Sequence, residues 1–116
     1  MLPSLWSMKM NPDAQSAASL VGVDRLIHEP SRSVILAVLA AVESADFLYL
    51  LRETGLTKGN LTVHLSKLEA AGFIEIEKTY RGKLPLTLCH ITDKGKQAFK
   101  DYRQQLRKFL IDSEAE

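Results

Sequence analysis

A polar helix that carries one apolar stripe and runs straight into an alternating strand is the feature that most constrains this fold. The segment 56–77 reads LTKGNLTVHLSKLEAAGFIEIE. Thr57 is a favourable N-cap, and Gly72 stands where a glycine with positive φ often closes a helix, so we predict a helix of about four turns. Its apolar positions recur at spacings of four and three and therefore face a core. They are Leu61, Leu65 and Leu68.

The opposite side of this predicted helix is small, polar or cationic and holds no acid before Glu69. It consists of Gly59, Thr62, Val63, Ser66 and Lys67, with Asn60 and His64 on its flanks. Such a side suits a DNA major groove, because base edges need hydrogen-bond partners and phosphates repel carboxylates. Glycine at position 59 costs about 1 kcal/mol of helix propensity, yet it lets backbone N–H groups approach a phosphate. The alternative is an ordinary solvent-facing side, with His64 a solvent-exposed ring.

The neighbouring segments complete a recognisable arrangement. Residues 31–43 and 46–54 predict two helices, the second capped by Asp46 and closed at Gly55, and with the polar helix they form a helix-turn-helix. Residues 73–80 and 86–92 then predict two strands. The segment RGKLP at 81–85 gives these strands a basic turn, in which proline is confined to an edge or a strand start.

In this order, several stretches resemble the winged helix-turn-helix regulators of the MarR and ArsR type, in particular their small single-domain subgroup. The stretches are PSRSVIL at 30–36, TKGNLTVHLSKLE at 57–69, AGFI at 71–74 and ITDKG at 91–95, and the likeness covers about residues 26–110. It implies an α+β, mainly α fold with a two-stranded β-wing and with N- and C-terminal helices that form a dimer interface.

The same resemblance implies a transcriptional regulator that binds double-stranded operator DNA as a homodimer. The recognition helix would lie in the major groove and the wing in or beside the minor groove. The DNA-binding residues carried over are Lys58, Gly59, Asn60, Thr62, Val63, His64 and Lys67 on the helix, and Arg81 and Lys83 on the wing. The alternative function is a winged-helix protein-interaction module without DNA-binding activity.

The distribution of charged residues along the chain favours a polyanionic partner. The whole chain has a net charge of only +1, but residues 57–96 hold seven Lys or Arg against four acids, while the rest holds eight against ten. Positive charge thus collects on the predicted helix and wing, and DNA affinity should depend strongly on salt.

Dimerisation is predicted from a long C-terminal helix at about 94–111. Its apolar side chains recur at spacings of three, four and three and need to be covered. They are Phe99, Tyr102, Leu106 and Phe109, joined by Leu110. A short helix at about 20–29 would add Leu20, Val23 and Ile27 to the interface. The alternative is that the long helix folds back on its own domain.

The chain of 116 residues, 46% of them hydrophobic, suits one domain. We expect a flexible tail at 1–19 and a winged helix domain at 20–112. Nothing at the N-terminus predicts a signal peptide or a membrane-spanning helix, so we expect a cytoplasmic protein without a membrane partner. Translation could start at Met1, Met8 or Met10.

Catalytic and metal chemistry finds no support in the sequence. We identify no nucleophile triad, no phosphate loop and no paired acids, so we expect neither an enzyme nor a cofactor. The single Cys89 lacks the paired ligands of a zinc site, and it would point away from His90 on a strand. Cys89 is predicted to be a small buried hydrophobe, with a redox or metal sensor as the alternative. No effector ligand can be named.

Overall fold

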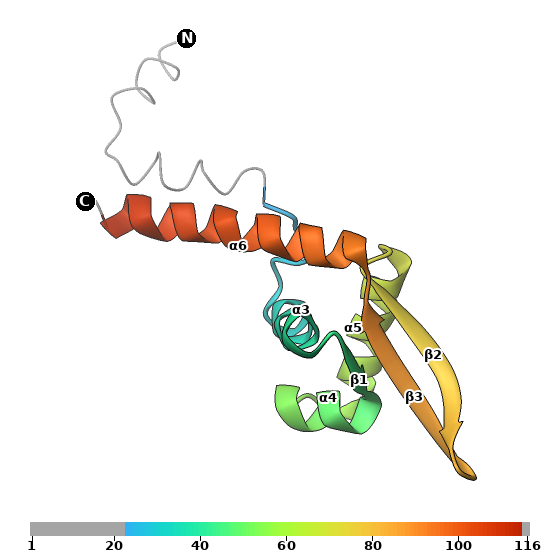
Figure 1. Ribbon diagram of the computed structural model, residues 1–116. Coiled ribbons are helices and arrows are strands. Elements are labelled where there is room, and N and C mark those ends of the chain that lie inside the picture. The colour runs from blue at the N-terminus through green and yellow to red at the C-terminus, as the bar shows by residue number, and fades with distance from the viewer. Residues whose placement is uncertain (1–22, 115–116) are drawn as a thin grey trace. The chain divides into compact units, whose positions relative to one another are not determined.

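The computed structural model describes residues 23–114, which fall into two compact units. One unit is residues 24–100, and the other holds, of the described residues, Val23 and 101–114. The elements are α3 Pro30–Val42, β1 Ser44–Asp46, α4 Phe47–Thr54, α5 Lys58–Ala70, β2 Ile74–Arg81, β3 Leu84–Ile91 and α6 Asp93–Glu114 (Figure 1). The predicted winged helix-turn-helix is confirmed, with α5 as the polar helix and β2–β3 as the wing.

Helix α3 is the centre of the first unit, because it contacts α4, α5, β1 and β3. It begins at Pro30, whose missing N–H costs nothing in a first turn. The Glu29 carboxylate caps it by accepting hydrogen bonds from the backbone N–H groups of Ser31 and Arg32. The fully buried side chains of residues 24–100 come from α3 itself and from the segments packed around it. They are Ile27, Ile35, Leu36, Leu39, Leu50, Leu61, Leu68, Ile74 and Cys89.

The helix ends agree with the caps read from the sequence. Asp46 accepts from Tyr49 N at the start of α4, and Gly55 ends that helix in the left-handed conformation with φ 71°. Thr57 accepts from Asn60 N at the start of α5, and Gly72, just beyond its end, has φ 81°. The three predicted core leucines of α5 are 0–3% exposed, and each such burial stabilises the fold by about 2 kcal/mol.

The sheet has a third strand that the sequence did not predict. Its order is β1-β3-β2, and all pairs are antiparallel. Strand β1 is only Ser-Ala-Asp, without a β-branched or aromatic residue, so it carries no strand signal of its own. It forms because Ala45 pairs with Cys89 and both side chains are buried in the core.

The wing is a tighter hairpin than the predicted turn at 81–85. Arg81 pairs with Leu84, so only Gly82 and Lys83 form the loop, and Gly82 has φ 64° as a two-residue hairpin turn requires. Pro85 lies inside β3, opposite Tyr80. It is tolerated there because β1 pairs only with residues 88–90, which leaves this part of β3 on an edge, as the sequence argument required.

The short helix expected at about 20–29 is not present in its described part. Residues 23–29 form bends and turns, and Leu20 lies outside the described residues. The Asp24 carboxylate explains the difference, because it accepts hydrogen bonds from Leu26 N at 2.8 Å and Ile27 N at 3.3 Å. Such local side-chain bonds compete with helix formation.

The exit of α5 is hydrogen-bonded to the beginning of α6 through three consecutive carbonyl groups. Ala71 O accepts from Lys94 Nζ at 2.8 Å, and Gly72 O accepts from the Thr92 hydroxyl at 2.7 Å. Phe73 O accepts from Thr92 N at 3.0 Å. The Thr92 hydroxyl oxygen also accepts from the N–H of Gly95, at 2.9 Å, and so caps α6.

Helix α6 is longer than the predicted 94–111, and its residues differ widely in exposure. Tyr102 is buried, Leu106 and Phe109 are half-buried, and Leu110 and Ile111 are 53% and 55% exposed. Val23, Ile27 and Phe99, the other described residues of the predicted dimer interface, are buried within one chain. In the stretch from 23 to 114, no helix combines the length and hydropathy that a bilayer crossing needs.

Candidate nucleic-acid interface

The outward side of α5 lies where the sequence predicted it. Six of the predicted helix residues are solvent-exposed: Lys58, Gly59, Asn60, Thr62, Val63 and Lys67. Val63, at 50% exposure, offers a methyl surface in the middle of this polar side. Glu69 in the last turn is the only acid on α5. The first three turns can therefore approach phosphates without carboxylate repulsion.

The first turn of α5 is sterically open. A Cβ placed on Gly59 would meet no atom within 4 Å. The Thr57 hydroxyl oxygen accepts a hydrogen bond from the backbone N–H of Asn60 at 3.2 Å. The Thr62 hydroxyl donates to Lys58 O at 2.8 Å, so its hydrogen is already used. Thr62 can then offer an outside partner only its oxygen lone pair and its methyl group.

A groove of about 580 Å³ separates the outward side of α5 from the wing, and its lining comes from both. It is lined by Phe47, Thr62, Leu65, Ser66, Glu69, Ile76, Lys78 and Thr87. Lys78 Nζ lies 3.4 Å from Thr87 Oγ1 across the hairpin. Sequence reasoning counted Lys78 as a charge but missed it as a site residue. The hairpin register pairs Lys78 with Thr87, and period-two alternation puts Lys78 on the same sheet face as buried Ile74.

The wing tip is cationic and weakly held. Lys83 is exposed, and Arg81, whose side chain is 73% exposed, lies 3.8 Å from the Asp46 carboxylate. An exposed ion pair of this kind contributes at most about 1 kcal/mol. Arg81 can therefore exchange its carboxylate partner for a phosphate at little cost.

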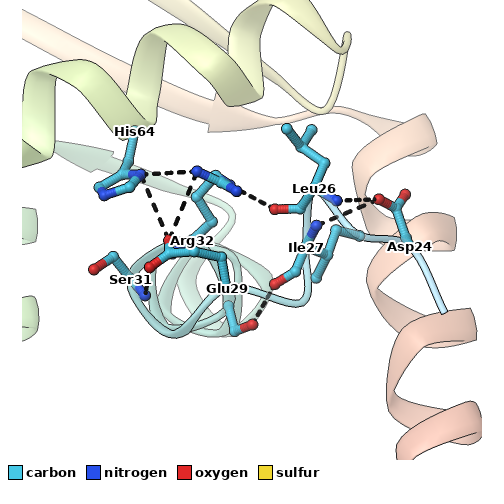
Figure 2. Close-up of polar contacts among 8 residues, drawn as sticks. Asp24, Leu26, Ile27, Glu29, Ser31, Arg32 and His64 are labelled. Carbon is cyan, nitrogen blue, oxygen red and sulfur yellow. Dashed lines mark hydrogen bonds and ion pairs between the residues drawn. The ribbon is translucent and has the colours of Figure 1, made fainter. Parts of the chain in front are cut away.

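His64 is the one predicted DNA-binding residue that is not exposed on the surface. Its side chain is 17% exposed, and its Nδ1 lies 3.1 Å from Arg32 Nη1 and 3.5 Å from Glu29 Oε2, at the start of α3 (Figure 2). The His64 ring therefore contacts the start of α3 within the protein. A contact between His64 and DNA stays a prediction.

Two of the seven cations counted in residues 57–96 make contacts within the protein itself. Lys94 donates to Ala71 O and lies 5.6 Å from the centre of the Phe73 ring, and Lys96 pairs with the Glu43 carboxylate at 3.2 Å. The remaining cations define what we call the cationic surface of α5 and the wing. It consists of Lys58, Lys67, Lys78, Arg81 and Lys83.

Cys89 is a buried core residue, as the sequence argument favoured. Its side chain is 0% exposed, and burial raises the pKa of the thiol to about 11. A protonated thiol without solvent access is a poor nucleophile and a poor metal ligand. The neighbouring His90 instead pairs with Glu77, at 3.0 Å. Across residues 23–114 there is no cluster of three His, Cys, Asp or Glu side chains that could hold a metal ion.

Known proteins share this architecture. Residues 32–110 match the family model described as winged helix DNA-binding domain. An uncharacterised protein of Methanocaldococcus jannaschii is 41% identical over 78 residues, which cover 67% of this chain and 85% of that protein.

Solved structures agree. A transcriptional regulator homologue from Pyrococcus horikoshii OT3 matches with a TM-score of 0.75 and 26% identity, over 85% of this chain and 96% of that one. A MarR-family transcriptional regulator from Silicibacter pomeroyi matches in fold, with a TM-score of 0.58 and 15% identity over 90% and 65% of the two chains. Together with the helix-turn-helix and wing described above, the match over residues 32–110 shows that the chain belongs to the winged helix DNA-binding domain family.

Proposed function

We propose that the protein is a sequence-specific transcriptional regulator that binds operator DNA as a homodimer, with α5 in the major groove and the β2–β3 wing at the minor groove. One observation carries the proposal: the outward side of α5, which holds no acid before Glu69 in the last turn, is exposed, and Thr62 and Ser66 on this side line a groove whose other wall is the wing. An α-helix fits a major groove, and its side chains can then reach base edges.

The two elements would have different tasks in the complex. Asn60, Thr62 and Lys67 carry the hydrogen-bonding groups that distinguish bases, and the Val63 methyl groups suit contact with thymine. Lys78, Arg81 and Lys83 supply positive charge that binds phosphates regardless of sequence. The predicted list is thereby extended by Lys78.

A homodimer is supported by the exposed apolar end of α6. Leu110 and Ile111 are more than half exposed, and Leu106 and Phe109 are half-buried. A second copy related by two-fold symmetry would cover them, and two-fold dimers are the commonest assembly. We therefore place the dimer contact on these residues rather than on Val23, Ile27, Phe99 and Tyr102, which are buried within one chain.

The test compares two pairs of variants in fluorescence anisotropy on a selected and a random duplex over a range of salt concentrations. Asn60→Ala and Lys67→Ala should each lower discrimination between the duplexes by about 1–3 kcal/mol. Arg81→Ala and Lys83→Ala should weaken binding to both duplexes and reduce the salt slope by about 1 per lost phosphate contact.

Lys100→Ala is the matched control, because it removes one exposed positive charge from α6 outside the cationic surface. It should leave both discrimination and salt slope near the wild-type values. If all four interface variants bind like this control, the proposed surface is wrong. If the wild-type protein binds no duplex at moderate salt and captures a protein partner instead, the interaction-module alternative holds.

A further inference from the structure

A buried arginine connects the recognition helix to the segment that precedes α3. The Arg32 side chain is only 11% exposed, although arginine is rarely buried without partners. Its Nε donates to Leu26 O at 2.5 Å, and its Nη1 lies 3.1 Å from Nδ1 of His64 on α5 (Figure 2). One guanidinium thus holds two segments that are 38 positions apart in the chain.

The chemistry of this contact fixes the state of the His64 ring. A guanidinium has only donors, so the hydrogen bond to Arg32 requires that Nδ1 of His64 accept. The ring is then the tautomer that carries its proton on Nε2, and its orientation is set from the α3 side. Because His64 lies in the middle of α5, this contact fixes the position of the helix relative to α3.

Glu29 holds the guanidinium in place. Its Oε2 is 3.7 Å from Arg32 Nη1 and accepts from Arg32 N at 3.0 Å, while Oε1 accepts from Ser31 N at 3.1 Å. Burial by itself raises the pKa of Glu29, but the hydrogen bonds from Ser31 and Arg32, with the charge of Arg32, lower it below the ordinary value. The carboxylate therefore stays ionised opposite Arg32.

We propose that Arg32 is a positioning residue for DNA recognition, which acts through the acceptor atom Nδ1 of His64 rather than by touching DNA. The inference rests on the proposed function and adds a residue that lies outside the cationic surface. The reason is geometric: hydrogen bonds to base edges need placement within about 0.5 Å. Contacts to phosphates tolerate more movement. Loss of the Arg32–His64 bond should therefore lower sequence discrimination more than general DNA affinity.

Two substitutions of His64 separate positioning from folding. His64→Asn can place its amide oxygen near the position of Nδ1 and keep an acceptor for Arg32, whereas His64→Leu keeps bulk and removes the acceptor. Leucine is the better helix former, so an effect through helix stability alone would favour the leucine variant. We expect the opposite for recognition. His64→Asn should keep the ratio of selected to random duplex affinity within about two-fold, and His64→Leu should lower it about ten-fold.

A double-mutant cycle tests whether Arg32 acts through this ring. Arg32→Gln should also lower the ratio about ten-fold, and adding it to His64→Leu should lower the ratio little further, because the shared contact is already lost. Unfolding midpoints of all variants are measured alongside, and binding is measured well below the lowest midpoint. Equal losses in His64→Asn and His64→Leu, or full additivity with Arg32→Gln, would overturn the proposal.

The outcomes also separate this inference from the proposed function. A wild-type protein that distinguishes no duplex rejects the function itself. A wild-type protein that does distinguish duplexes, together with an Arg32→Gln variant that distinguishes them equally well, rejects only the positioning role.

Discussion

The two ends of α5 differ in how much of the protein surrounds them. At the N-terminal end, a Cβ on Gly59 would meet nothing within 4 Å. Beyond the C-terminal end, three successive carbonyl groups accept hydrogen bonds from Thr92 and Lys94, and a Cβ on Gly95 would lie 2.1 Å from Phe73 O. One end is open to a large ligand, and the other is fixed to the sheet and to α6.

This contrast shows how a short polar helix can be both well placed and accessible. The outward side of α5 has few apolar groups to bury, so its position depends on Leu61, Leu65 and Leu68 underneath and on the fixed C-terminal end. The first turn, which carries the free N–H groups of a helix, is left uncovered. Substitutions at the two ends should therefore have opposite consequences for stability and for binding.

The largest expected effect is that of Gly95→Ala. The added methyl group would overlap a backbone oxygen that cannot move without breaking its bond to Thr92 N, so we expect the free energy of unfolding to fall by about 3 kcal/mol. Urea unfolding at a fixed protein concentration measures the change. A fall below about 0.5 kcal/mol would show that the close junction between Phe73 and α6 is wrong.

A smaller effect is expected for Thr92→Val. Valine has the same shape but no hydroxyl, so Gly72 O loses its donor and Gly95 N loses its acceptor. Loss of a cap and a partly buried hydrogen bond should cost about 2 kcal/mol. Thr92→Ser keeps the hydroxyl and serves as the control. If serine and valine destabilise equally, the threonine methyl group matters rather than the two hydrogen bonds.

The smallest effect, and the one of opposite sign, is expected for Gly59→Ala. It adds the same methyl group as Gly95→Ala but in open space, so helix propensity should raise the free energy of unfolding by about 1 kcal/mol. In the proposed complex the methyl group would hinder approach of the first turn to a phosphate, and DNA affinity should fall. A variant that is more stable and binds equally well would show that this turn does not contact the backbone.

Local patterns predicted much of the fold. The leucine spacing, the caps Asp46 and Thr57 and the glycines at 55 and 72 define α4 and α5 by interactions within a few residues. The exposed side of α5 was predicted for the same reason, since a helix buries one stripe and exposes the rest.

Features that depend on distant partners could not be predicted. Strand β1 exists only through its pairing with β3. The missing helix before α3 has a different, local cause, because the Asp24 carboxylate accepts hydrogen bonds from Leu26 N and Ile27 N and so favours turns. Lys78 joins the groove through the hairpin register. His64 was expected on the DNA side, but its ring is held by Arg32, which no spacing rule connects to it.

The most direct test of the central claim, that the outward side of α5 and the wing bind duplex DNA in a sequence-specific way, is selection of bound duplexes from a random oligonucleotide pool by the purified, folded wild-type protein. The account predicts enrichment of a two-fold symmetric site whose half-sites lie about one helical turn, or a multiple of it, apart. A pool that keeps its starting composition after repeated rounds at low salt would contradict the account.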